Sequence, residues 1–166
     1  MTRLRDSVIK KYQKAVDKSR EALSSEITIY YRTGNKITCQ QCLWDPVLKE
    51  TLDPNCTYCN GNYYLDEIKN VTIYANTSWV GLSDYFKPII TPAGELGIND
   101  VYITCKLSDV LIDPTNQAGS TYFDASTKIV INNIVTVKKT TPIKYGLAGT
   151  FYSCALIATI DSTQKQ

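Results

Sequence analysis

Two pairs of cysteines place the strongest constraint on how this chain of 166 residues can fold. Cys39 and Cys42 form one C-x-x-C motif, Cys56 and Cys59 form the second, and thirteen residues separate the two pairs. Each tight turn can present two thiolates to one ion, and zinc accepts four sulfur ligands in a tetrahedron. Because four protein ligands leave no open coordination position, the motif predicts a structural zinc site.

Disulfide formation and dithiol redox chemistry are the other uses of paired cysteines. Disulfide frameworks are typical of small secreted domains, whereas the basic start of this chain is not followed by the apolar segment of a signal peptide. We therefore expect a protein made in a reducing cytoplasm. A redox C-x-x-C motif usually opens a helix, and the sequence predicts no helix in the cysteine insert, residues 36–62. A thiol redox enzyme stays as an alternative.

The first part of the chain has the pattern of an amphipathic helix. Apolar residues recur at steps of three and four between residues 4 and 23, without glycine or proline. We assign residues 1–26 to this helix. Seven basic residues against three carboxylates give it a charge of +4, which fits a solvated face or an arm that binds DNA or a partner. The whole chain carries only +2, which does not indicate a dedicated nucleic-acid binder.

The rest of the chain has the texture of strands. Residues 27–31, 71–75, 100–107 and 151–160 are β-branched or alternate between apolar and polar, and residues 128–139 predict a hairpin that turns at Asn132 and Asn133. The predicted fold is mainly β: a small antiparallel β-barrel or sandwich over residues 27–160 that contains the zinc insert, followed by a polar tail, residues 161–166. The expected core residues are Val101, Ile103, Cys105, Ile129, Ile131, Cys154, Leu156 and Ile160.

Two further cysteines lie outside the C-x-x-C motifs. Cys105 and Cys154 fall on the apolar faces of two alternating strands. Buried thiols often act as small hydrophobic side chains, and this is the role we expect. A disulfide between them is the alternative if the two strands pair, although a reducing cytoplasm argues against it.

The composition gives little indication of a catalytic site. The chain contains no histidine, which excludes Ser-His-Asp and Cys-His nucleophilic sites and histidine-ligated metals. The carboxylates are scattered over predicted turns and strand ends, where they are commonly solvated. A pair of them could still meet in the folded chain, as in glycosidases. We expect a protein that is not an enzyme.

Residues 82–99 predict a long loop with an unusual apolar load. The segment contains two prolines and two glycines and has no clean period. Exposed apolar residues at such density usually mark an interface. The alternative is a loop that folds back and plugs its own domain. The predicted interface residues are Tyr85, Phe86, Ile89, Ile90 and Leu96.

The cysteine insert predicts a rigid protrusion rather than a phosphate-binding surface. It has too few apolar residues to bury a core alone, so metal binding would supply much of its folding free energy. Between the cysteine pairs, the charged residues are one lysine, Lys49, and three carboxylates, Asp45, Glu50 and Asp53. The acidic balance disfavours contact with nucleic-acid phosphates. A zinc-ribbon module of a regulator, which binds a partner or nucleic acid, is nevertheless the second functional hypothesis.

The organisation of the whole chain resembles a known group of proteins. The resemblance rests on the basic N-terminal helix, on residues 27–32, on Cys39-x-x-Cys42 and Cys56-x-x-Cys59-x-Gly61, and on the closing strands. Those strands include the patterns at residues 119–122, 128–134 and 137–139. Together these features resemble the small neck proteins of tailed bacteriophages, the head-closure (stopper) or head–tail connector group. Many stoppers lack a zinc insert, so a docking role for it is inferred from its residues alone.

The resemblance implies a structural subunit of a virion. Such proteins form homo-oligomeric rings in the neck, between head and tail, where they close the DNA-filled head and dock the tail. The implied partners are other copies of the chain and the portal, adaptor and tail proteins. Packaged DNA would pass through the channel without sequence-specific binding, and no membrane is involved. The protein would be made in the cytoplasm of the bacterial host.

Overall fold

A long helix opens the chain, as the apolar periodicity predicts. The computed structural model describes residues 2–80, 89–147 and 150–163. In it, α1 spans Thr2–Leu23 and β1 begins at Ser25, so the predicted boundary at residue 26 lies too late. The polar pair of serines after Leu23 separates the helix from the β-branched strand that follows. Over the described ranges, no helix is both long enough and apolar enough to cross a membrane.

The chain divides into two compact units, which are described separately. The first unit comprises Met1–Tyr31 and Asn70–Gln166, and the second comprises Arg32–Lys69. Two long strands contribute to both units: β1 (Ser25–Thr38) and β4 (Tyr64–Trp79). The second unit is thus wider than the predicted insert of residues 36–62, because these strands continue well beyond the segments that the sequence predicted as β.

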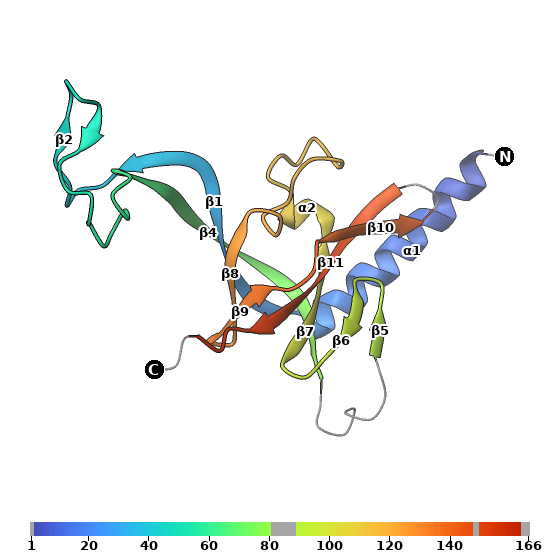
Figure 1. Ribbon diagram of the computed structural model, residues 1–166. Coiled ribbons are helices and arrows are strands. Elements are labelled where there is room, and N and C mark those ends of the chain that lie inside the picture. Colours follow the sequence, from blue (N-terminus) through green and yellow to red (C-terminus); the bar gives the residue numbers. More distant parts are fainter. Residues whose placement is uncertain (1, 81–88, 148–149, 164–166) are drawn as a thin grey trace. The chain divides into compact units, whose positions relative to one another are not determined.

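The first unit is built on an antiparallel sheet (Figure 1). In the described part of the chain, the sheet has seven strands in the order β10-β11-β7-β4-β1-β8-β9, and β11 also pairs with β9. The strand pairings therefore run in a closed circuit within a mainly β, antiparallel fold, as predicted. The further elements are β7 (Asp100–Lys106), the short helix α2 (Leu107–Val110), β8 (Ser126–Ile131), β9 (Ile134–Lys138), β10 (Ile143–Leu147) and β11 (Thr150–Ile160).

The core of this unit follows the alternation of the strands. Ile103 on β7 lies opposite Leu156 on β11, and both side chains are fully buried. Seven of the eight expected core residues are buried, whereas Ile160 is 36% exposed, so the prediction is wrong for this residue. Ile160 is the last residue of β11 and lies where that strand meets the short strand β9.

Cys105 and Cys154 occupy directly opposed positions on β7 and β11. Both side chains are fully buried within the apolar core. The Cys105 Sγ lies 3.8 Å from the carbonyl oxygen of Cys154. The two thiols thus take the place of small hydrophobic residues between the strands, as expected.

The hairpin predicted over residues 128–139 is present. β8 pairs with β9, with Ile131 opposite Ile134. The two turn residues, Asn132 and Asn133, have φ values of 49° and 66°. These left-handed conformations are those of a two-residue type I′ turn, for which asparagine is well suited.

Residues 82–99 contain more regular structure than the sequence predicted. β5 (Ile89–Thr91) pairs with β6 (Gly94–Leu96) in a small hairpin. Of the predicted interface residues, Ile90 is exposed and Ile89 is half-buried, but Leu96 is only 7% exposed and so is not available for docking. The remaining two, Tyr85 and Phe86, lie outside the described residues.

A buried ion pair lies at the start of β7. Asp100 is 2% exposed, and its carboxylate accepts hydrogen bonds from the Lys139 ammonium and from the Gly97 backbone N–H, at 2.7 Å in the second case. Burial by itself raises the pKa of Asp100, but these hydrogen bonds outweigh it and hold the pKa below its ordinary value. The pair ties the end of the β5–β6 hairpin to β7 and to the segment after β9.

We expect Asp100 to make the stability of the first unit depend on acid pH. A carboxyl whose pKa is lower in the folded than in the unfolded state stabilises the fold above the unfolded pKa, about 3.9. This contribution is lost as the pH falls through the folded pKa. Asp100→Asn should cost about 1–3 kcal/mol at neutral pH and should reduce the loss of stability between roughly pH 5 and pH 2. Urea unfolding at several pH values measures both effects.

Asp53→Asn is the matched control for this experiment, since Asp53 is an exposed carboxylate of the second unit. It should leave the pH dependence of the first unit unchanged. Equal pH dependence in the wild type and in Asp100→Asn would contradict the assigned role of the ion pair.

Candidate metal centre

The second unit brings the four cysteines of the C-x-x-C motifs together. The Sγ atoms of Cys39, Cys42, Cys56 and Cys59 all lie within 4.8 Å of one another, and each residue is between 3% and 7% exposed. Cys39 and Cys56 are 3.9 Å apart and Cys42 and Cys59 are 3.2 Å apart, measured between sulfur atoms. A metal–sulfur distance of about 2.3 Å would allow one ion to contact all four. The cluster is therefore compatible with a metal site.

A small hairpin and several backbone hydrogen bonds fix the two cysteine turns. Between the cysteine pairs, β2 (Trp44–Asp45) pairs with β3 (Glu50–Thr51), which returns the chain to the second motif. The Cys39 N–H donates to the carbonyl of Tyr63 at 2.6 Å, and the Asn62 N–H donates to the carbonyl of Cys59 at 3.0 Å. The first bond joins the segment before the first motif to the segment after the second.

Position 61 requires glycine because the backbone there lies close to Pro54 in the same unit. Its φ is +75°, and a Cβ at this position would lie 2.4 Å from the backbone carbonyl oxygen of Pro54. Such a contact is impossible without movement of the loop that carries Cys56. This contact with Pro54 could not be predicted from the sequence, because it depends on how the loop between the motifs returns to the second motif.

We expect Gly61→Ala to weaken metal binding and to loosen the second unit. The new methyl group would displace Pro54 and with it the turn that holds Cys56 and Cys59. Gly34→Ala is the control, since Gly34 also has a positive φ (+83°) but has open space around its Cβ position. Both variants carry the backbone strain of alanine at positive φ, about 1 kcal/mol, and only Gly61→Ala carries the clash. Competition with a chromogenic chelator should show a lower metal affinity for Gly61→Ala alone, and equal affinities would contradict the role of this contact.

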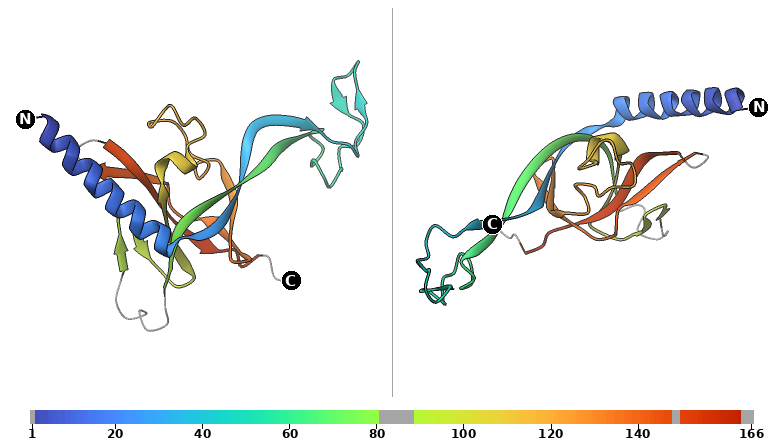
Figure 2. Two further views of the ribbon diagram at one scale, coloured as in Figure 1. Left: turned by 180° about the vertical axis from the view of Figure 1, so that it is seen from behind. Right: turned by 90° about the horizontal axis from the view of Figure 1, so that it is seen from above.

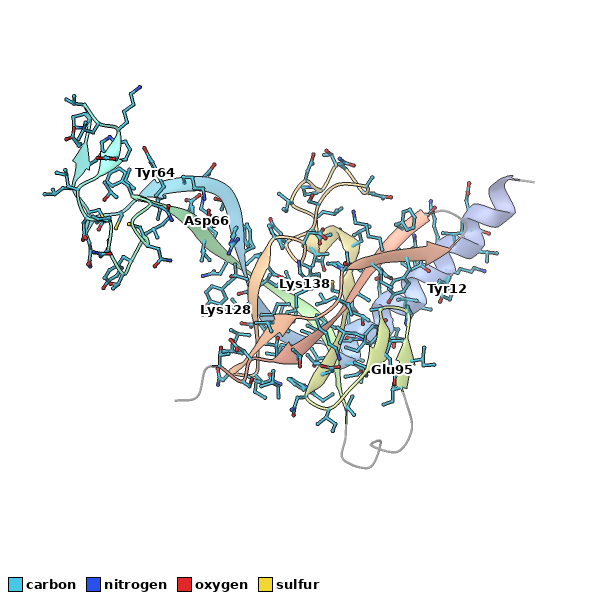
Figure 3. All side chains as sticks on the ribbon, in the orientation of Figure 1. Tyr12, Tyr64, Asp66, Glu95, Lys128 and Lys138 are labelled. Atoms are coloured by element: carbon cyan, nitrogen blue, oxygen red, sulfur yellow. The ribbon has the colours of Figure 1, made fainter. Side chains whose placement is uncertain are left out.

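Aromatic side chains form a second cluster beside the cysteines. The rings of Trp44 and Tyr63 are stacked with centroids 4.7 Å apart, and Tyr64, labelled in Figure 3, meets Tyr63 edge-on at 5.2 Å. Tyr63 and Leu65 also pack against the cysteine cluster. This cluster was not predicted from the sequence. The available signal was the position of Tyr63 and Tyr64 four and five residues after Cys59 and of Trp44 two residues after Cys42.

Charged residues of β1 and β4 are joined by ion pairs and hydrogen bonds in this unit. Asp66, also labelled in Figure 3, pairs with the Lys36 ammonium and with the Arg32 Nε, at 3.4 Å in the second case. The hydrogen bond from Lys36 is the main cause that lowers the pKa of Asp66. Glu67 accepts a hydrogen bond from the Thr33 hydroxyl at 2.6 Å. These carboxylates are thus engaged in joining the two strands.

The thiols of the cluster differ in acidity. Hydrogen bonding, chiefly from Cys42, lowers the pKa of Cys56 to about 7. The same interaction raises the pKa of Cys42, and burial adds to this effect. Metal binding requires thiolates, so a bound ion must displace protons from this cluster.

The scattered carboxylates that the sequence left as possible catalytic pairs have local roles. Asp113 accepts a hydrogen bond from the Thr115 N–H at 2.9 Å, and Asp124 accepts one from the Thr121 N–H at 2.7 Å. Asp100 is held by Lys139, and Asp66 by Lys36. Asp113 and Asp124 are thus satisfied within their own loops, Asp66 by a residue of the neighbouring strand, and Asp100 by a lysine that follows β9.

Large apolar side chains of the second unit are strongly exposed. The β2–β3 hairpin and the segments beside it carry a set that we call the apolar tip: Leu43, Val47, Leu48, Leu52 and Tyr58. Val47 is 85% exposed and Leu43 is 72% exposed. Exposed apolar residues at this density in one segment make it a candidate contact surface.

The second unit therefore combines a set of four potential metal ligands with an exposed apolar surface. The sequence identified the first, and the structure adds the second. No family model, no curated protein and no solved structure matches the chain.

Proposed function

We propose that the chain is a structural, non-enzymatic subunit of a head-to-tail connector ring in the neck of a tailed bacteriophage. The observation that carries this proposal is the apolar tip on a unit held by four cysteines. An exposed apolar surface on a small metal-stabilised unit suits assembly with other proteins. The resemblance in chain organisation supplies the identity of the assembly.

The proposed metal is a structural Zn²⁺. A tetrahedral zinc site with sulfur at about 2.3 Å places the sulfur atoms about 3.8 Å apart; the Cys39 and Cys56 sulfurs are 3.9 Å apart, and the Cys42 and Cys59 sulfurs, at 3.2 Å, would separate slightly to admit the ion. An all-thiolate set favours zinc over the hard cations Mg²⁺ and Ca²⁺. Four protein ligands leave no position for substrate or water, so the ion would hold the unit in shape and would not take part in chemistry.

The ring subunit would contact several proteins and would enclose DNA. Other copies of the chain, the portal or adaptor above and the tail proteins below are the proposed neighbours. The acidic segment between the cysteine pairs, with three carboxylates and one lysine, suits protein contact better than contact with phosphates. DNA would pass through the channel without sequence-specific binding.

The particle from which the native protein is recovered tests this proposal directly. We expect the protein to co-sediment with DNA-filled phage particles and an antibody against it to label the junction of head and tail. A knockout of the gene should yield heads that leak DNA or fail to join tails. Normal infectious particles without the protein would contradict the proposal.

The alternative function, a zinc-ribbon module of a regulator, can be distinguished from the ring subunit by a binding experiment. Such a module should bind an oligonucleotide or a transcription complex, with a steep dependence on salt in the case of nucleic acid. The isolated ring subunit should show little affinity for oligonucleotides at physiological salt. Tight, salt-dependent binding together with absence from particles would favour the regulator.

A further inference from the structure

We propose that the apolar tip of one copy of the chain docks on the outward face of helix α1 of a second copy. This inference rests on the proposed function, in which copies form a ring, and it names the two surfaces that meet. The occupant of the tip is therefore this chain itself, through a surface of opposite charge.

The tip is a preorganised surface. The carboxylate of Asp45 accepts hydrogen bonds from the N–H groups of Val47 and Leu48, at 2.8 Å and 3.1 Å. These bonds fix the turn between β2 and β3 and leave both apolar side chains exposed. Because the turn is already ordered, docking would cost little conformational entropy.

Carboxylates lie in the same segment as the apolar residues of the tip. The segment between the two cysteine pairs contains three carboxylates, Asp45, Glu50 and Asp53, and one basic residue, Lys49, so its net charge is −2. Glu50 and Asp53 are exposed. The complementary surface should therefore be apolar at its centre and basic at its edge.

Helix α1 carries a basic face with an exposed apolar residue beside it. Lys11, Lys14 and Lys18 are exposed and follow one another at steps of three and four, which places them along one face. The exposed Val8 lies beside this face, whereas the ring of Tyr12, labelled in Figure 3, meets the ring of Tyr152 edge-on at 6.1 Å within the first unit. The helix as a whole carries seven basic residues against three carboxylates.

Helix α1 belongs to the first unit, and Figure 2 shows it running along the sheet of that unit. Ile9, Gln13 and Val16 are half-buried, and a cavity of about 300 Å³ between the helix and the sheet is lined by Gln13, Lys106 and Phe151 among others. The helix is thus anchored on one face, while its lysine-bearing face is available to another molecule.

Contact between two different surfaces of identical chains is head-to-tail. Such a contact leaves one free tip and one free helix on every pair, so that further copies can add until a ring closes. Because each surface carries charge of one sign, contacts between identical surfaces, helix against helix or tip against tip, would be disfavoured by repulsion. The inferred contact thus has the symmetry that a ring requires.

Two variants and their mixture test the contact. The tip variant carries Val47→Asn and Leu48→Asn, and the helix variant carries Lys14→Glu and Lys18→Glu, all at exposed positions. Sedimentation of the full chain should show concentration-dependent oligomers for the wild type. Each variant alone should associate about tenfold or more weakly. Their equimolar mixture should stop at dimers, since only one intact tip and one intact helix remain per pair.

Charge exchange supplies the positive control. A chain that carries Lys14→Glu, Lys18→Glu, Glu50→Lys and Asp53→Lys should regain the association that the helix variant loses. Metal content and circular dichroism should be unchanged in every variant, which shows that both units remain folded.

Three outcomes would overturn the inference. These are a monomeric wild type at all concentrations, association that neither variant weakens, and loss of association in the tip variant alone, which would indicate contact between two tips. None of them removes the protein from the head–tail junction of the particle. Failure of this contact is therefore distinguishable from failure of the proposed function.

Discussion

Replacing Cys42 with serine is expected to release the bound metal and to unfold the unit Arg32–Lys69, while the sheet of the first unit persists. The second unit exposes most of its large aliphatic side chains, so that the aromatic cluster and the cysteines provide most of its buried apolar contacts. Metal binding can supply on the order of 10 kcal/mol of folding free energy to such a unit. A serine hydroxyl does not replace a thiolate ligand, so this free energy would be largely lost.

Metal analysis and amide hydrogen exchange measure the two parts of this prediction. Wild-type protein purified without chelator should contain about one equivalent of zinc per chain, and Cys42→Ser should contain much less. Exchange protection should disappear over Arg32–Lys69 and persist in β7 and β11, whose core is made by other residues.

Cys154→Ala is the matched control, because it removes a buried thiol of the first unit. It should lower the stability of the sheet and leave the metal content at one equivalent. A wild-type protein that contains no metal but keeps a protected second unit would contradict the metal site.

The cysteine cluster could be predicted from the sequence because the spacing of residues close together in the chain determines it. Two residues separate the cysteines of each motif, and this spacing alone places both thiols on one side of a tight turn. The hairpin at Asn132 and Asn133 is predictable for the same reason, since asparagine tolerates the left-handed backbone that the turn needs. In both cases the residues that decide the structure are neighbours in the chain.

The features that the sequence did not predict depend on contacts between distant residues. Leu96 is buried at the end of the β5–β6 hairpin; Pro92 and Gly94 are a turn signal, but residues 82–99 lack the alternation that would indicate which side chains the pairing buries. Ile160 continues the alternation of β11, but its neighbours no longer cover it at the end of the strand. Periodicity predicts which face a side chain shares, not whether another element covers that face.

The exposed surface of the second unit was also beyond prediction in detail. The sequence indicated that the insert could not bury a core, but it did not indicate which apolar residues would remain outside. Trp44 is partly covered because it stacks on Tyr63, which lies nineteen residues later in the chain. Val47 and Leu48 remain exposed because Asp45 fixes a turn that directs them outward.

Replacing Leu156 with alanine is expected to lower the free energy of unfolding of the first unit by about 2–5 kcal/mol. Leu156 is fully buried and lies opposite Ile103 near the middle of the register between β11 and β7. β11 also pairs with β9 and β10, so its neighbours are held by several strands and cannot easily collapse into the space that the leucine leaves. The cost should therefore include a cavity contribution in addition to the lost transfer free energy.

Urea unfolding followed by circular dichroism measures this loss, and Ile160→Ala is the control on the same strand. Because Ile160 is 36% exposed, its truncation removes less buried apolar surface and should cost under about 1.5 kcal/mol. Both variants should retain the metal, since all four cysteine ligands lie in the other unit. If Leu156→Ala costs no more than Ile160→Ala, the side chain at position 156 does not lie in the core, and the register between β7 and β11 must differ from the one described.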